Sequence, residues 1–118
     1  RHIDLLGHLD APLFPFDIDT VVRACATGGK FIEINNSSFF VRKGGDKVRN
    51  DIIESCKRYA AGVVVNSDAH SPWDAGNVSE AMRLLEKMEF PPELIFNRRA
   101  ENLAEHIKKH HGRDVLVR

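Results

Sequence analysis

The run Gly62–His70, GVVVNSDAH, constrains the fold of this chain more than any other stretch. Three consecutive valines are typical of a strand buried on both faces of a parallel sheet. The strand ends in polar residues, and Asp68 and His70 lie two positions apart, so extended backbone projects both to the same side. Ligands of α/β proteins bind at this carboxyl end. The pair therefore suits divalent-metal binding or acid–base chemistry, and equally a turn-capping carboxylate beside a solvated imidazole.

Two further strand-like runs precede this one, and predicted helices separate the three. Residues 3–7 (IDLLG) are followed at once by His8 and Asp10, and residues 30–36 (KFIEINN) carry Glu33 within an apolar pattern. Apolar residues recur at helical spacing in four regions, which are residues 18–25, 48–59, 78–88 and 100–107. Strands that alternate with helices of about a dozen residues predict an α/β fold of parallel β-α-β units.

Several boundaries can be predicted from local chemistry. Asp17 or Asp19 can cap the first helix, and Asn77 and Asn97 can cap the third and the last. Residues 37–47 are predicted to form a long loop, because glycine and polar residues interrupt the periodicity.

Composition places the chain in the globular class. Its 118 residues are 42% apolar, and 17 basic side chains balance 17 acidic ones, so nothing indicates a nucleic-acid partner or an anionic membrane surface. Cys25 and Cys56 lie in predicted helix faces and are expected to be reduced core thiols of a cytoplasmic protein. No apolar run approaches the ~20 residues that a membrane helix needs.

Charged residues near the strand ends are further candidates. Glu33 requires a partner, because an unpaired buried carboxylate is very costly, and that partner is either structural or a bound group. Arg42 and Lys43 precede a glycine pair just beyond a predicted strand. Two cations there suit an anionic group such as phosphate, although a solvated basic loop has the same pattern.

Taken in order, the motifs at these strand ends resemble a known family. They are GH at residues 7–8, EINNSS at residues 33–38, RKGG at residues 42–45 and SDAH at residues 67–70, followed by FPPE at residues 90–93. This series resembles the carboxyl-terminal half of the PHP (polymerase and histidinol phosphatase) superfamily, and is most similar to its YcdX-like phosphatase branch. The resemblance covers nearly the whole chain.

The resemblance implies a distorted (β/α)7 barrel, of which residues 1–118 would be the carboxyl-terminal portion of a single domain with the amino-terminal half absent. It implies hydrolysis of a small phosphorylated substrate by metal-activated water at a trinuclear cluster of divalent ions, usually Zn, with Mn or Fe as alternatives. Matched by position, the metal ligands are His8, Asp68 and His70, the phosphate- or substrate-binding residues are Arg42, Lys43 and Asn35, and the residues that support them are Glu33 and Ser67. Asp10 departs from the family pattern and receives no role.

The same resemblance limits what this chain can do alone. The three matched ligands serve three different ions in the family, so none would be complete, and we expect the chain by itself to be inactive or nearly so. An incomplete barrel exposes sheet edges and apolar surface, and we expect a homo-oligomer, in the first instance a dimer.

Two other functions remain open. One is a non-catalytic PHP-like structural or accessory module, against which the intact His8, Asp68 and His70 argue. The other is a metal-dependent amide hydrolase on a similar barrel, against which the Arg42–Lys43 loop argues.

Overall fold

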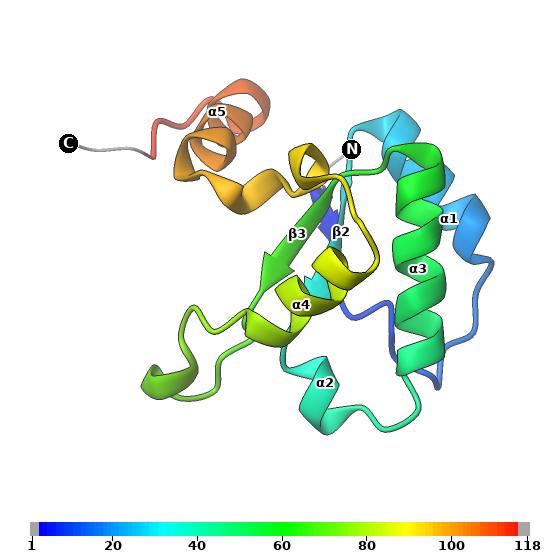
Figure 1. Cartoon of the computed structure of the whole chain (residues 1–118). Coiled ribbons are helices and arrows are strands. Elements are labelled where there is room, and N and C mark those ends of the chain that lie inside the picture. The colour runs from blue at the N-terminus through cyan, green and yellow to red at the C-terminus, as the bar shows by residue number, and fades with distance from the viewer. Residues whose placement is uncertain (1–2, 116–118) are drawn as a thin grey trace.

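A computed structural model describes residues 3–115, and within them three parallel strands and five α-helices form the predicted α/β fold (Figure 1). The strands are β1 (Leu5–Leu6), β2 (Phe31–Asn35) and β3 (Val63–Asn66). The helices are α1 (Ile18–Gly28), α2 (Ser38–Val41), α3 (Asp46–Tyr59), α4 (Ser79–Lys87) and α5 (Ala100–His111), with 3-10 turns η1 (Pro72–Asp74), η2 (Pro92–Leu94) and η3 (Phe96–Arg98). No helix in this part of the chain is long and apolar enough to cross a membrane.

The strands lie in the order β1-β2-β3, with Leu6 opposite Ile32 and Ile32 opposite Val63. Both crossover helices, α1 and α3, pack on the same side of this sheet (Figure 1). Ile32 and Ile34 are buried in the core that α1 and α3 cover, whereas Glu33 between them lies on the other side of the sheet. Buried partners from the rest of this core include Val22, Cys25, Ile52, Ile53, Cys56, Val63, Val65, Ala81 and Leu85.

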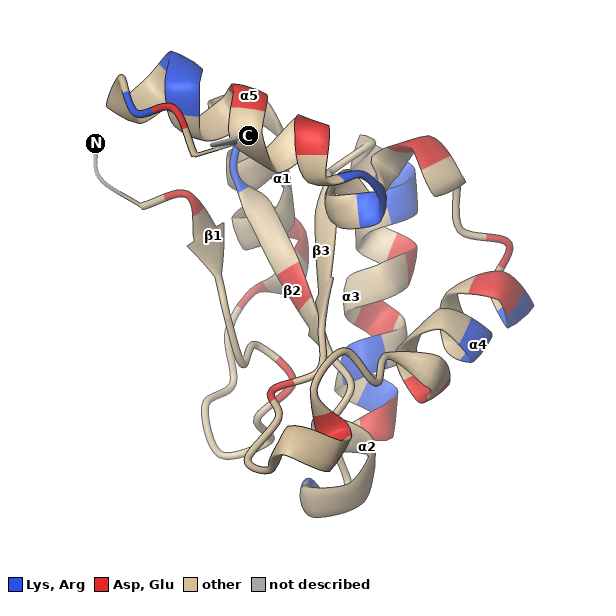
Figure 2. Cartoon of the chain, turned by 90° about the vertical axis from the view of Figure 1, so that its left-hand side faces the viewer, with Lys and Arg blue, Asp and Glu red and all other residues tan. Residues whose placement is uncertain are grey.

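The opposite side of the sheet, here called the open face, carries Leu5, Phe31, Glu33, Asn35, Val64 and Asn66. Figure 2 looks onto this face and shows α5 lying across the amino ends of the strands. His106 of α5 contacts the Phe31 ring edge-on, with ring centroids 5.2 Å apart. Because α5 lies at the amino ends, it does not cover the carboxyl ends of the strands, where the predicted site lies. The loops that follow each strand surround those ends.

The first helix begins where its predicted capping residue lies. The N–H of Thr20 donates to Asp17 Oδ1 at 2.9 Å, which caps α1. The long loop predicted over residues 37–47 is wrong at both ends. The Ser38 N–H donates to Asn35 Oδ1 at 3.1 Å and starts α2, and α3 already begins at Asp46.

The prediction that Asn97 caps the last helix is wrong. The Asn97 amide instead lies alongside β3, where its Oδ1 accepts the Val65 N–H at 3.0 Å and its Nδ2 donates to the Val65 carbonyl at 2.7 Å. One side-chain amide thus satisfies the outward-facing N–H and C=O of a residue in the edge strand. Together with a bridge between Val63 and Ile95, it covers that edge of the sheet.

The cap of α4 also comes from a distant residue. The helix begins at Ser79, and Asn36, beyond the end of β2, accepts the N–H groups of Glu80 and Ala81 at 2.9 and 3.0 Å through its Oδ1. Asn77 makes only local contacts to Ser79. The amino end of α4 is therefore fixed to the carboxyl end of β2.

We predict that Asn97→Ala lowers the free energy of unfolding by about 1–3 kcal/mol, because it leaves the polar groups of a buried strand residue unpaired. Urea unfolding followed by circular dichroism measures the change. The matched control is Asn50→Ala on the exposed face of α3, which should stay within about 0.5 kcal/mol. Equal midpoints for the two variants would contradict the role given to Asn97.

The two cysteines are buried and unpaired, as expected. Burial, with the nearby Cys25 as a further cause, raises the pKa of Cys56 to about 12, and burial also raises the pKa of Cys25. Because the thiolate is the reactive form, we predict that a disulfide reagent at pH 8 labels both thiols readily in urea and only slowly in the folded protein. Rapid labelling under native conditions would contradict this packing.

Candidate functional site

The candidate site forms where the carboxyl ends of the three strands meet, and the Asn35 side chain lies at its centre. Asn35 is 3% exposed, and its Nδ2 donates to Asp68 Oδ2 at 3.0 Å. The same nitrogen lies 3.3 Å from His8 Nδ1. The structure therefore brings together three of the predicted residues from three separate strand ends.

Arg42 reaches this cluster from the segment after α2. Its Nη2 lies 2.6 Å from His8 Nδ1, and its Nη1 donates to the His8 carbonyl at 3.3 Å and to Asp10 Oδ1 at 3.0 Å. Lys43, the other predicted cation, is exposed and makes no hydrogen bond or ion pair within residues 3–115. The structure thus separates two neighbouring cations that the sequence could not distinguish.

Asp10, which received no role from the sequence, holds Arg42 in place. Its buried carboxylate accepts from Arg42 through Oδ1, and from Arg49 Nε through Oδ2 at 3.1 Å. Ser38 Oγ donates to Oδ1 at 3.2 Å. The Arg49 guanidinium is itself buried and lies over the Phe39 ring, 4.0 Å from its centroid. The one signal in the sequence was an acidic residue beside a strand end, which gave no hint of these partners.

Glu33 has the partners that its place in the sheet requires. Its Oε2 accepts the His8 N–H at 3.0 Å, and its Oε1 accepts from Asn66 Nδ2 at 3.0 Å. A Cβ on Gly7 would lie 3.0 Å from Oε2, so the close approach of this segment to the carboxylate depends on glycine. Glu33 therefore orients the backbone that presents His8.

Two site residues adopt a backbone conformation that L-residues rarely take. His8 has φ of 59° and Asp68 has φ of 50°, both in the left-handed region. Within residues 3–115 two other non-glycine residues have positive φ, Ala60 and Glu89, and both lie at or just beyond the ends of helices. Strained conformations are retained where the surroundings hold them firmly, and here the Asn35 amide contacts both side chains.

The electrostatics of the cluster keep Asp68 ionised. The hydrogen bond from Asn35 is the largest cause that lowers the pKa of Asp68 below its usual value, and desolvation opposes it. Electrostatic interactions with the neighbouring His70, His8 and Arg42 side chains lower this pKa further. A carboxylate held in this way is a ready acceptor for a cation or a hydrogen-bond donor.

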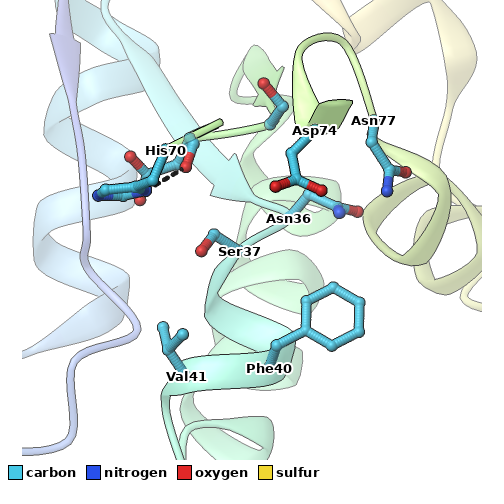
Figure 3. A pocket seen from close by; sticks show the side chains of 9 residues that line it. Asn36, Ser37, Phe40, Val41, His70, Asp74 and Asn77 are labelled. Atoms are coloured by element: carbon cyan, nitrogen blue, oxygen red, sulfur yellow. Dashed lines mark hydrogen bonds between the residues drawn. The ribbon is translucent and has the colours of Figure 1, made fainter. Parts of the chain in front are cut away.

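A cavity of about 380 Å³ opens beside Asp68 (Figure 3). Its walls come from α2 and from the segment after β3. They consist of Asn36, Ser37, Phe40, Val41, Ser67, Asp68, His70, Asp74 and Asn77. Ser67 and His70, both predicted from the sequence, thus belong to the wall of this cavity, whereas His8 and Arg42 lie outside it.

The predicted metal ligands fit a metal ion only in part. His70 Nδ1 lies 2.8 Å from the Asp68 carbonyl, so Nδ1 carries the proton and Nε2 has a free lone pair, as in metal-ligating histidines. At His8 the guanidinium of Arg42 can only donate, so Nδ1 accepts, the proton lies on Nε2, and neither nitrogen is free. No three His, Cys, Asp or Glu side chains among the described residues could hold one ion. These residues therefore do not form a complete metal site.

No family model matches the chain. It is similar to bacterial proteins that are each named probable phosphatase, and this similarity supports a phosphatase-like family. It is 38% identical over 108 residues to one from Acetivibrio thermocellus, which covers 92% of this chain and 45% of that protein. It is 39% identical over 109 residues to one from Caldanaerobacter subterraneus subsp. tengcongensis (92% and 43%) and over 116 residues to one from Caldicellulosiruptor bescii (98% and 48%). The chain spans about half the length of the curated relatives it matches.

We predict that Asp10→Asn lowers the free energy of unfolding by about 3 kcal/mol, because it removes the buried carboxylate that Arg42 and Arg49 share and leaves Arg49 only its ion pair with the exposed Asp46. Urea unfolding measures this loss. Asp51→Asn is the matched control, since it removes only an exposed pair with Lys47 and should cost no more than about 0.5 kcal/mol. A similar small loss for both variants would show that Asp10 is not structurally important.

Proposed function

We propose that the chain forms the phosphate-binding part of a phosphoesterase of the PHP type, in the YcdX-like branch. The observation that carries this proposal is the convergence of Asn35 and Arg42 on His8 and Asp68 at the carboxyl ends of parallel strands. The names of the relatives, which are probable phosphatases, support the same activity. Ligand sites at this position are the rule in α/β folds.

Arg42 is the residue that we assign to the phosphate group. A guanidinium has five N–H donors, and within residues 3–115 the structure gives Arg42 three contacts, to His8 and Asp10. Donors that remain free are suited to the paired oxygens of a phosphoryl group, where the positive charge offsets the charge of the transition state. Asp10 acts through Arg42, since it fixes the orientation of the guanidinium.

We also propose that divalent ions take part, with Zn preferred and Mn or Fe as alternatives. Asp68 and His70 have the donor atoms for this role, while His8 would first have to lose its contact with Arg42. A complete site would need ligands from outside the described residues.

The fold that we propose for the complete domain is a distorted (β/α)7 barrel. Successive parallel strands here lie side by side in chain order, and their crossover helices share one side of the sheet. Barrels are built in this way, whereas doubly wound sheets reverse strand order and carry helices on both faces. The open face with Glu33 and Asn35 would then face the interior of the barrel.

The proposed activity is tested with an extended protein, in which this chain replaces the matching segment of one of its relatives. We predict that this protein releases phosphate from p-nitrophenyl phosphate when Zn or Mn is added, and that Arg42→Ala lowers kcat about 100-fold. The chain alone should show no turnover above buffer, because its described residues do not complete a metal site.

Arg83→Ala is the matched control, because Arg83 is exposed and pairs only with Glu80 on α4. Its kcat should stay within about twofold of the unchanged protein. Full activity in Arg42→Ala, or robust turnover by the chain alone, would contradict the proposal. If the extended protein folds and binds metal without releasing phosphate, an accessory role becomes the better interpretation.

We further propose that the chain forms a homodimer through β1. In residues 3–115 nothing pairs with the outer edge of this strand, and Ile3 and Leu5 are 57% and 40% exposed. Light scattering should therefore report a dimer at micromolar concentration, and Leu5→Lys should shift it to the monomer. Leu103→Lys, at an exposed position on α5, is the control and should leave the dimer intact. A monomer for the unchanged chain would contradict this assembly.

A further inference from the structure

We propose that the cavity beside Asp68 binds the alcohol portion of the phosphate ester, and that this portion is a compact apolar group that carries a positive charge. The inference rests on the proposed function, since it names the class of substrate for the same site. The cavity lies between α2 and the segment from Ser67 to Asn77, and it shares Asp68 with the phosphate-binding cluster (Figure 3). A substrate with its phosphoryl group on the Arg42 side of this cluster would extend past Asp68 into this space.

One wall of the cavity is apolar. Phe40 and Val41, on α2, are 67% and 68% exposed, and both line the cavity. Figure 3 shows both side chains on the same side of the cavity. A volume of about 380 Å³ lies at the lower end of the range for small-molecule pockets, which are mostly apolar with a few polar groups. The cavity therefore suits a group the size of a single ring.

The opposite wall carries a negative charge. Asp74 lies across the cavity from His70 (Figure 3), and its Oδ2 accepts from Ser71 Oγ at 2.6 Å. Its other carboxylate oxygen has no partner within residues 3–115, and no Lys or Arg lines the cavity. A ligand with a positive group here would gain a charge-assisted hydrogen bond, whereas an anion would be repelled.

Two groups that could have held an anion are already engaged elsewhere. Arg42 lies outside the cavity, on the His8 side of the cluster. At the amino end of α4, the N–H groups of Glu80 and Ala81 donate to Asn36 Oδ1. The cavity is therefore suited to the organic part of a substrate, and the phosphate group is suited to the Arg42 side.

The test uses the full chain and three probes of the same shape and different charge, which are benzylamine, benzyl alcohol and benzoate. Each is titrated into the 15N-labelled protein, and binding is followed by NMR chemical-shift changes. We expect dissociation constants on the order of millimolar for such small ligands, with shifts at Ser37, Val41 and Asp74. Benzylamine should bind about two- to fivefold more tightly than benzyl alcohol, and benzoate more weakly than both.

Two variants test whether the charge preference comes from Asp74 and whether the apolar contact comes from Phe40. Asp74→Asn should abolish the preference for benzylamine over benzyl alcohol, because the amide still accepts from Ser71 and lacks the charge. Phe40→Ala should weaken all three probes by about two- to tenfold. Phe14→Ala is the matched control, since Phe14 is an exposed aromatic residue outside the cavity and its loss should change nothing.

The inference is overturned if benzoate binds as tightly as benzylamine, if Asp74→Asn leaves the preference unchanged, if the shifts map outside the cavity, or if no probe binds. These probes contain no phosphoryl group and the readout is binding. A failure of phosphatase activity alone therefore leaves this result intact, and the two proposals fail separately.

Discussion

The arrangement of the site depends on one buried carboxylate. Asp10 accepts from two guanidinium groups, that of Arg42 directly after α2 and that of Arg49 in the first turn of α3. A buried ion pair is costly unless its hydrogen bonds are well made, and Ser38 supplies a further one. The result is that a glycine-rich segment, which would otherwise be free to move, delivers the Arg42 guanidinium to His8.

Features that depend on local patterns could be predicted from the sequence. The valine run and the alternation of Ile32 and Ile34 indicate buried parallel strands, and the structure places them in the core. Asp17 caps a helix through its own neighbours, so its role is visible locally. The meeting of His8 and Asp68 follows from topology, because parallel strands deliver their carboxyl ends to one edge of a sheet.

Long-range side-chain contacts could not be predicted in this way. Asn36 caps a helix that begins 43 residues later, and Asn97 satisfies a strand residue 32 positions away. An amide or carboxylate can pair with any group within reach, and the sequence does not reveal which one folding brings there. The separation of Arg42 from Lys43 has the same origin, since it depends on Asp10, a partner from another loop.

The pairing between Asn97 and β3 makes the two edges of the sheet different. Along β3 the side-chain amide of Asn97 and the bridge to Ile95 use backbone groups that a further strand would need. Ile95 thus takes the place that a following strand would occupy beside β3, whereas the outer edge of β1 has no partner within residues 3–115. A side-chain amide thereby occupies backbone groups through which an exposed strand edge could otherwise template aggregation.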